Sequence, residues 1–312
     1  MSPSTFRTYQ SNAKSVSYLT VFASLLFCLV PASAYAIEIP QWWKDAHQYD
    51  PDKELYDYLN FTTACFGPNA LPVPELYDGR IPEKKQAELT ADAYWGFGDK
   101  TQSVSARFVY IPGSGRFSIS GWGVLAEHYK TTTAVRDQRA SIIESGEGTL
   151  LIGDLYISTL IGLFKEKKYC PDLNLEFVLK TSSSNSPYEA RYFDTPGYWF
   201  DLTAGKSILF SRAFVNELRF VGVLGFLSYQ LNSASQNDAP LYGGKVILSS
   251  DKWSLENGIH GYSGWLDKGD KPLVFRSKLN FKSGNMLYFI QYQHALRDYP
   301  FRRIQTGVNL SF

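Results

Sequence analysis

The last twelve residues, 301–312, restrict the fold most, because their side chains divide into two incompatible sets at a strict period of two. A pleated strand turns alternate side chains to opposite faces. One face carries Ile304, Thr306, Val308, Leu310 and Phe312, and the other carries Arg303, Gln305, Gly307, Asn309 and Ser311. The first face suits hydrocarbon and the second suits water. The stretch therefore predicts a strand with one face towards hydrocarbon and the other towards water. The alternative is an amphipathic strand at the end of a soluble β-sandwich.

Segments of about ten residues with the same alternation recur from residue 88 onward. We expect twelve strands, at residues 88–97, 102–111, 116–128, 149–164, 172–181, 198–209, 216–230, 240–249, 252–265, 272–282, 285–295 and 301–312. Each is long enough for a tilted strand to cross a bilayer. In 116–128 and 216–230 apolar residues fall on both faces, which a bulge or an apolar lumen would explain. The pattern predicts an all-β fold, a transmembrane antiparallel β-barrel of about twelve strands over residues 88–312.

The connections between these segments alternate in length. The short set is 112–115, 165–171, 211–215, 250–251 and 283–284, and the long set is 129–148, 182–197, 231–239 and 266–271. Bacterial outer-membrane barrels have even strand numbers, short periplasmic turns and longer external loops. We therefore expect both ends of the barrel in the periplasm and the long connections outside the cell.

Residues 1–36 have the features of a secretory signal peptide. Arg7 and Lys14 precede a short apolar run at 16–30, and an Ala-x-Ala site ends at Ala36. Cys28 suggests a lipoprotein signal instead, but the bulky Phe27 stands where a small residue is expected. Removing this peptide takes two of the 31 basic residues and none of the 30 acidic ones, which leaves a net charge of −1. Neither nucleic acid nor an anionic surface is implied as a partner.

Composition agrees with a membrane barrel. Aromatic residues make up 16% of the chain, although no apolar run of about 18 residues follows the signal peptide. Aromatic side chains typically form girdles at the two interfaces of a membrane barrel. Cys65 and Cys170 remain after processing, and their spacing leaves open whether they pair.

Residues 37–87 have no place in an even count of strands. The stretches Gly67-Pro68-Asn69 and Leu71-Pro72-Val73-Pro74 are too rich in turn residues for a transmembrane strand, although 56–66 could form one more. Trp42 and Trp43 are candidates for the inner interface. We favour a segment that folds into the lumen from the periplasmic side and partly plugs it. The alternative is a periplasmic tail lying across the barrel mouth.

The spacing Gln305-x-Gly307-x-x-Leu310-x-Phe312 resembles the signal that the barrel-assembly machinery reads in outer-membrane barrels. This resemblance implies that the assembly machinery is a partner of the chain. It also implies a location in the outer membrane of a Gram-negative bacterium, among outer-membrane lipids.

Several motifs resemble an uncharacterised family of outer-membrane β-barrels of Bacteroidota type. They are Gly67-Pro68-Asn69, Pro72-Val73-Pro74, Gly153-Asp154-Leu155, Leu179-Lys180-Thr181, Ala190-Arg191-Tyr192, residues 194–198, Gln291-Tyr292-Gln293 and residues 297–301. The Gly-Asp-Leu strand and the strand ending in Leu-Lys-Thr are also distantly similar to barrels encoded with aromatic-degradation pathways, which are presumed to move hydrophobic solutes. Neither family has an assigned catalytic residue to transfer, so the resemblance implies fold and location only.

Ionisable residues on the predicted inner faces are the candidate lumen-lining residues. The main candidates are Asp92, Arg107, Asp154, Glu176, Lys180, Arg219, Lys245, Glu256, Arg276, Lys278 and Arg303, with Glu88, Asp201, Glu217 and Lys282 beside them. In a narrow barrel such charges most often pair across the lumen and hold a plug. A solute path would require some of them to stay unpaired and accessible to water.

An outer-membrane hydrolase is the hypothesis from another class. His260 and Ser263 are the tempting pair, but residues three apart on a strand point to opposite faces and cannot form a nucleophile–base hydrogen bond. Asp267, Asp270 and Asp298 match no compact calcium motif, so we expect neither a metal nor a cofactor. Residues 194–200 concentrate aromatic side chains, which indicate an interfacial girdle more than a stacking site.

Together these features predict a narrow, passive outer-membrane channel for small or hydrophobic solutes. An accessory or structural barrel that binds a partner protein is the alternative, and a lipid-modifying hydrolase is a weaker one.

Overall fold

The structure is a computed structural model that describes residues 38–59, 62–113, 115–184, 189–192, 195–211, 214–230, 237–264 and 270–312. Residues 39–312 form one compact unit. The predicted signal peptide, residues 1–36, lies outside the described residues.

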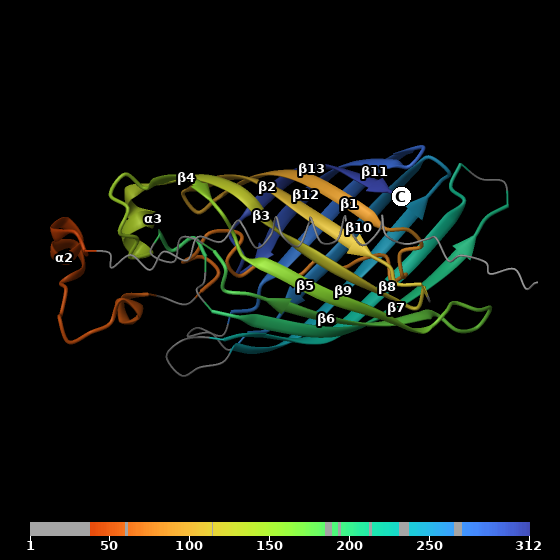
Figure 1. Cartoon of the computed structure of the whole chain (residues 1–312), viewed down its shortest axis with the longest axis horizontal. Helices are drawn as coiled ribbons and strands as arrows, with labels where there is room; N and C mark the ends of the chain where they lie inside the picture. The colour runs from red at the N-terminus through yellow and green to blue at the C-terminus, as the bar shows by residue number, and fades with distance from the viewer. Residues whose placement is uncertain are drawn as a thin grey trace, which may run out of the picture. The chain divides into compact units, whose positions relative to one another are not determined.

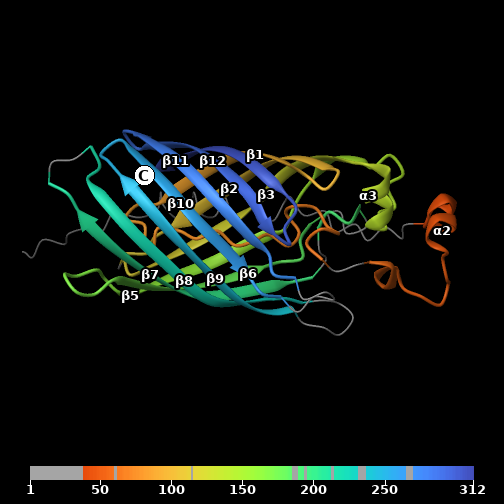
Figure 2. The same ribbon diagram turned by 180° about the vertical axis from the view of Figure 1, so that it is seen from behind.

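Within this unit one antiparallel sheet closes on itself (Figures 1 and 2). Its strands are β1 Gln86–Gly96, β2 Asp99–Tyr110, β3 Phe117–Thr131, β4 Glu147–Leu151, β5 Leu155–Phe164, β6 Asp172–Lys180, β7 Gly197–Leu209, β8 Glu217–Tyr229, β9 Asn237–Ser249, β10 Trp253–Tyr262, β11 Leu273–Ser283, β12 Met286–Arg297 and β13 Arg302–Ser311. Strand β13 pairs with β1, and β2 pairs with β3, which closes the ring. Strands β4 and β5 pair with different parts of β3 and act as one interrupted strand. The predicted twelve-stranded barrel is confirmed.

The two faces of the strands follow the predicted alternation. On β13, Ile304 and Leu310 are exposed on the outside, whereas Arg303 and Gln305 are buried inside. Among the described strands, those that form the ring pair on both sides, and the short β4 pairs with β3 alone. The closed ring matters because an unpaired amide or carbonyl facing lipid would cost several kcal/mol (about 4–8 in hydrocarbon).

The two segments with irregular patterns have separate causes. In β3, Val104 faces Ala126 and Ser105 faces Val124, so Leu125 is an extra residue in a bulge. The bulge shifts the inward phase of β3. In β8 the pairing is regular, and its inward apolar side chains instead pack against other residues inside the barrel. Both explanations offered by the sequence occur, one in each segment.

The connections differ between the two ends of the barrel. Residues 132–146 and 181–196 make long connections at one end, and residues 250–252 and 284–285 make short ones at the other. The first of the long connections contains the short helix α3, Thr133–Gln138, whose N-cap Thr132 accepts a hydrogen bond from the Val135 amide. By the rule for bacterial barrels, the end with long connections is the outer end and the other is the periplasmic end.

The N-terminal helix α2, Gln41–His47, packs against the connection that contains α3. Trp43 is fully buried there, and its indole Nε1 donates to the Ala140 carbonyl at 2.9 Å. Trp42 and Trp43 thus lie beside a connection at the end with long connections, away from the periplasmic turns. Neither helix is long or apolar enough to span a bilayer.

Residues 62–85 run inside the barrel and form what we call the luminal segment. A 3-10 helix, η1 Leu55–Tyr58, precedes it, and residues 62–66 form turns, so the described part of 56–66 contains no additional strand. Between residues 72 and 78 the segment has neither helical nor sheet structure. Its backbone groups must therefore find their partners on the barrel wall.

Two outward-facing positions of β12 can test where the lipid-facing apolar band of the barrel lies. We expect Ile290→Lys to lower the free energy of unfolding by about 2–4 kcal/mol, because Ile290 is exposed on the outer face near the middle of the strand. Met286→Lys, beside the periplasmic turn at 284–285, should cost about 0–1 kcal/mol. Denaturant titration of the barrel in lipid vesicles measures both. Equal costs at the two positions would contradict this placement of the band.

Candidate functional site

The luminal segment is anchored at the outer end by groups from the outer connections. The Thr63 amide donates to Asp270, and the Arg139 guanidinium donates to the Ala64 carbonyl at 3.3 and 3.4 Å. Further along, the Asn69 side-chain amide donates to Glu127 of β3 at 2.8 Å. These contacts join the segment to connections that are far from it in sequence.

Two arginines and two carboxylates form a buried cluster around this anchor. Asp99 accepts from both Arg139 and Arg191, and Arg191 also pairs with Glu127 at 2.9 Å. All four residues are at most 1% exposed. Burial alone would lower the pKa of the Arg191 guanidinium, but Glu127 and Asp99 outweigh it and raise that pKa. Removing one partner from such a cluster leaves an uncompensated buried charge, so the cluster resists rearrangement.

Below this cluster, apolar and aromatic side chains fill the lumen. Phe66, Leu71 and Val73 of the segment pack against a ring of inward side chains from the wall. The aromatic members of the ring are Tyr94, Tyr156, Trp199, Tyr229, Tyr262, Tyr299 and Phe301. Two tyrosine hydroxyls donate to the segment, one to the Pro68 carbonyl at 2.8 Å and one to the Pro72 carbonyl at 3.0 Å. The outer half of the lumen is therefore packed like a protein core.

Arg276 of β11 holds the middle of the segment. Its guanidinium donates to the carbonyls of Val73 and Pro74, at 2.6 and 2.9 Å, and to Gln293 at 2.8 Å. The planar fork of an arginine suits adjacent acceptors of this kind. The next residue, Glu75, forms an ion pair with Arg303 of β13.

Arg219 of β8 holds the periplasmic part of the segment. It donates to the carbonyls of Asp78 and Gly79, at 2.7 and 3.0 Å, and pairs with Asp172 and Glu166 at 2.8 and 2.9 Å. Gly79 has a φ of +71°, a conformation that favours glycine.

Glu166 lies in the connection between β5 and β6. Burial raises the pKa of its carboxyl, but hydrogen bonds from the Ser207 amide, Lys206 and Arg219 outweigh burial and lower the pKa to about 2. The folded-state pKa is depressed, so the stabilisation is present above the unfolded pKa of about 4.3 and is lost as pH falls towards 2.

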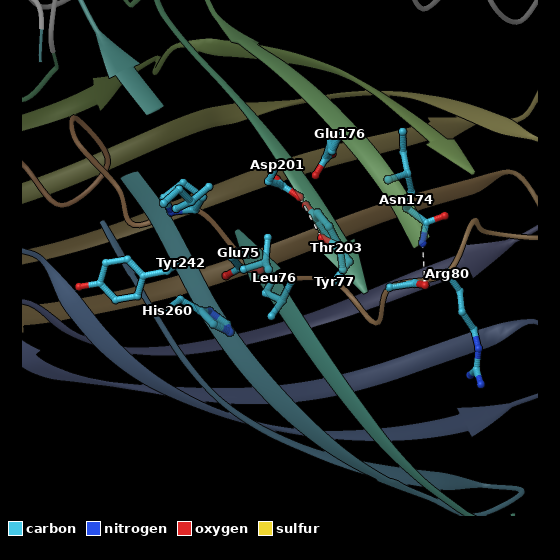
Figure 3. A pocket seen from close by; sticks show the side chains of 15 residues that line it. Glu75, Leu76, Tyr77, Arg80, Asn174, Glu176, Asp201, Thr203, Tyr242 and His260 are labelled. Atoms are coloured by element: carbon cyan, nitrogen blue, oxygen red, sulfur yellow. Dashed lines mark hydrogen bonds between the residues drawn. The ribbon is translucent and has the colours of Figure 1, made fainter. Parts of the chain in front are cut away.

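Two larger cavities adjoin the segment. One of about 820 Å³ reaches the periplasmic turn at Gly284 and Asn285, and the other, of about 170 Å³, lies between the segment and β3, β5 and β7. A third space of about 20 Å³ holds roughly one water. Figure 3 shows this small space, with Glu176 and Asp201 of neighbouring strands close to each other and Glu75 and Leu76 of the segment beside His260.

The structure places most of the predicted luminal residues on the cavity walls. Those that line the two larger cavities are Asp92, Arg107, Asp154, Glu176, Lys245, Glu256, Arg276, Lys278 and Arg303. Lys180 and Arg219 are fully buried in ion pairs instead, Lys180 with Asp154 at 2.7 Å. Lys245 pairs with Glu256, also at 2.7 Å.

Three of these residues form no ion pair with any described residue. Arg107 stacks between the rings of Tyr77 and Trp122, at 4.3 and 4.8 Å, and the Lys278 ammonium lies 3.8 Å from the centre of the Phe289 ring. Glu176 faces Asp201 across the strand pair β6–β7, where both groups are acidic. All three residues line both the 820 Å³ and the 170 Å³ cavity.

The residues of the proposed assembly signal occupy both faces of β13. Gln305 donates to Asp92 inside the barrel at 2.9 Å, and Leu310 and Phe312 are exposed outside. A β-carbon at Gly307 would lie 2.4 Å from the Phe289 ring, which explains the glycine by close packing. Recognition by the assembly machinery stays a prediction.

The other candidates fall in different surroundings. His260 Nδ1 lies 3.0 Å from the Arg276 guanidinium, whereas the Ser263 amide donates to the Pro240 carbonyl. Asp270 accepts from Thr63 at the outer anchor, and Asp267 and Asp194 lie outside the described residues. Trp199 points into the lumen, where it lines the 170 Å³ cavity, rather than into a girdle.

The buried cluster of Asp99, Glu127, Arg139 and Arg191 was not among the predicted site residues. Asp99 is the first residue of β2, and Arg139 and Arg191 lie in connections. Strand alternation therefore does not predict whether these three side chains face the lumen. In the sequence, Arg191 is marked only by the motif Ala190-Arg191-Tyr192, which carries part of the family resemblance.

No protein family and no curated protein matches the chain. Among solved structures, the COG4313 outer membrane channel from Pseudomonas putida F1 is similar over 78% of this chain and 97% of its own, at 14% identity and a TM-score of 0.50. The KdgM porin matches 72% of this chain and 99% of its own, at 10% identity and a TM-score of 0.43. The NanC porin matches 72% and 100%, at 9% identity and 0.46.

The similarity to the COG4313 channel supports the barrel fold and nothing beyond it. The location follows from the structure itself, because a closed barrel with an apolar exterior and an inward polar face suits a bilayer. The chain is thus a twelve-stranded transmembrane β-barrel of the outer membrane of a Gram-negative bacterium.

Proposed function

We propose that this protein is a narrow, passive channel for small or hydrophobic solutes, and that the luminal segment is its gate. The observation that carries the proposal is the division of the lumen into two halves. The outer half is packed by the segment and its aromatic neighbours around a cavity of about 170 Å³, whereas the inner half contains a cavity of about 820 Å³ that reaches the periplasmic turn at Gly284 and Asn285.

The unpaired charges inside the cavities support a solute path. A barrel filled only for stability has its luminal charges paired, because an unpaired charge away from water is costly. Arg107 and Lys278 stay outside the ion pairs and line the cavities, where water can reach them. Glu176 lines them too, but it is buried beside Asp201, and two adjacent buried carboxyl groups disfavour each other's ionisation. The aromatic ring above these residues offers contacts to a hydrophobic solute.

Such a channel requires no catalytic residue, and the proposal is of a non-enzymatic protein. Assistance from the barrel-assembly machinery and kinship with Bacteroidota barrels stay predictions from the sequence. A barrel that binds a partner protein is the second candidate, and the packed outer half of the lumen favours it over an open pore.

Removing the gate should open the channel. We expect the barrel without residues 37–85 to conduct several-fold more than the full mature chain in planar bilayers, because the packed outer half would become water-filled. Heat-modifiable migration on gels verifies that the truncated barrel is folded. A folded truncated barrel with no conductance would contradict the channel and direct attention to the partner-binding alternative.

A single substitution tests the gate without a deletion. We expect Arg276→Gln to increase the frequency of opening events, because the Val73 and Pro74 carbonyls lose their guanidinium donor. Lys282→Gln is the matched control: it also removes one positive charge from the 820 Å³ cavity, and among described residues its side chain makes no hydrogen bond to the luminal segment. Single-channel recording measures both variants. The same opening frequency in both would remove Arg276 from the gate.

A further inference from the structure

The luminal segment has contacts at both ends of the barrel. At the end with long connections, Thr63 contacts Asp270 and Ala64 contacts Arg139. At the opposite end, the Lys85 carbonyl accepts from the amide of Phe312 at 3.0 Å. The segment therefore passes through the whole lumen and does not fold back within it.

The length of the segment suffices for such a passage. The 24 residues from 62 to 85 reach at most about 80 Å when extended, and the hydrocarbon core of a bilayer is about 30 Å thick. A non-helical chain can lie at membrane depth only where protein or water satisfies its backbone. Arg276, Arg219 and the luminal tyrosines supply donors to its carbonyls along the way.

The residues before the segment lie at the outer end. Trp43 is buried against Ala140 and Ile142 of the connection that contains α3. The Arg136 guanidinium of α3 also lies 4.4 Å from the centre of the Trp42 ring. Contacts from two neighbouring residues of α2 therefore fix this helix to an outer connection.

We infer that the chain crosses the outer membrane thirteen times, once as the luminal segment and twelve times as strands. Residues 39–59 then lie on the cell surface, on the opposite side of the membrane from Phe312. This departs from the expectation that residues 37–87 enter the lumen from the periplasmic side and partly plug it. The inference does not depend on conduction, since a sealed barrel would have the same topology.

Cysteine labelling on intact cells tests this topology, and the chain supplies its own control. Cys170 is exposed in the short connection between β5 and β6, and Cys65 is buried. Lys53 is exposed before the luminal segment, so Lys53→Cys introduces a second accessible thiol. A maleimide attached to a polyethylene glycol of roughly 5 kDa is too large to pass through a lumen of this size. It therefore labels only thiols that face the medium.

We expect the Lys53→Cys protein to gain one label on intact cells and a second, at Cys170, only after the outer membrane is permeabilised. Lys53→Cys combined with Cys170→Ser should be labelled fully on intact cells, whereas the unchanged chain should not be labelled. If position 53 is labelled only after permeabilisation, residues 39–59 are periplasmic and the inference is wrong. Labelling of Cys170 on intact cells would also overturn it, because the barrel would then be inverted.

Discussion

Backbone hydrogen bonding at membrane depth is the constraint on which the rest of this structure depends. Hydrocarbon offers no partner for an amide or a carbonyl, so the sheet must close, and β13 meets β1 to do so. The same requirement applies a second time inside the barrel, because residues 72–78 form no secondary structure. The carbonyls of Pro72, Val73, Pro74 and Asp78 accept from side chains of the wall instead. The polar interior of the barrel thus replaces, for one extended chain, the neighbouring strands that it lacks.

Arginine is suited to this task for a geometric reason. Arg276 and Arg219 each donate to two successive carbonyls of the segment. A lysine ammonium has no planar fork and would hold such a pair less specifically. Arg219 also pairs with two carboxylates, which offset the burial of its charge. The inward charges are therefore mostly structural, and Arg107, Glu176 and Lys278 stand apart because no carboxylate or cation among the described residues pairs with them.

The strands could be predicted from the sequence because lipid enforces a two-residue period on every one of them. The bulge at Leu125 shows the limit of this prediction. Trp122 and Val124 are out of phase with Phe117 and Ile119, which indicates an irregular strand but does not specify a bulge. The luminal segment obeys no period, since its side chains meet the wall on all sides. Its prolines excluded a strand without specifying a path. The contact of Trp43 could not be predicted, because its partner, Ala140, lies 97 residues away in a long connection.

The distribution of contacts along the segment suggests where a gate of this kind would move. Towards the outer end, the fully buried charge cluster and the aromatic ring hold residues 63–73. Towards the periplasmic end, Arg219 holds residues 78 and 79. Between them, Glu75 and Tyr77 border both large cavities, and Leu76 borders the 820 Å³ cavity.

Leu76 gives these middle residues their main apolar contact, with Val221, Val223 and Ile247, and burial of such a side chain contributes about 1.5–3 kcal/mol. The Glu75 carboxylate is 36% exposed to the cavity, pairs with Arg303 and accepts from the Gln291 side-chain amide at 3.1 Å. Bowing of residues 75–77 into the cavity therefore costs less than withdrawal of the whole segment. Amide hydrogen exchange faster at residues 66–71 than at 75–77 would contradict this order, because local opening follows the least stable part of a structure.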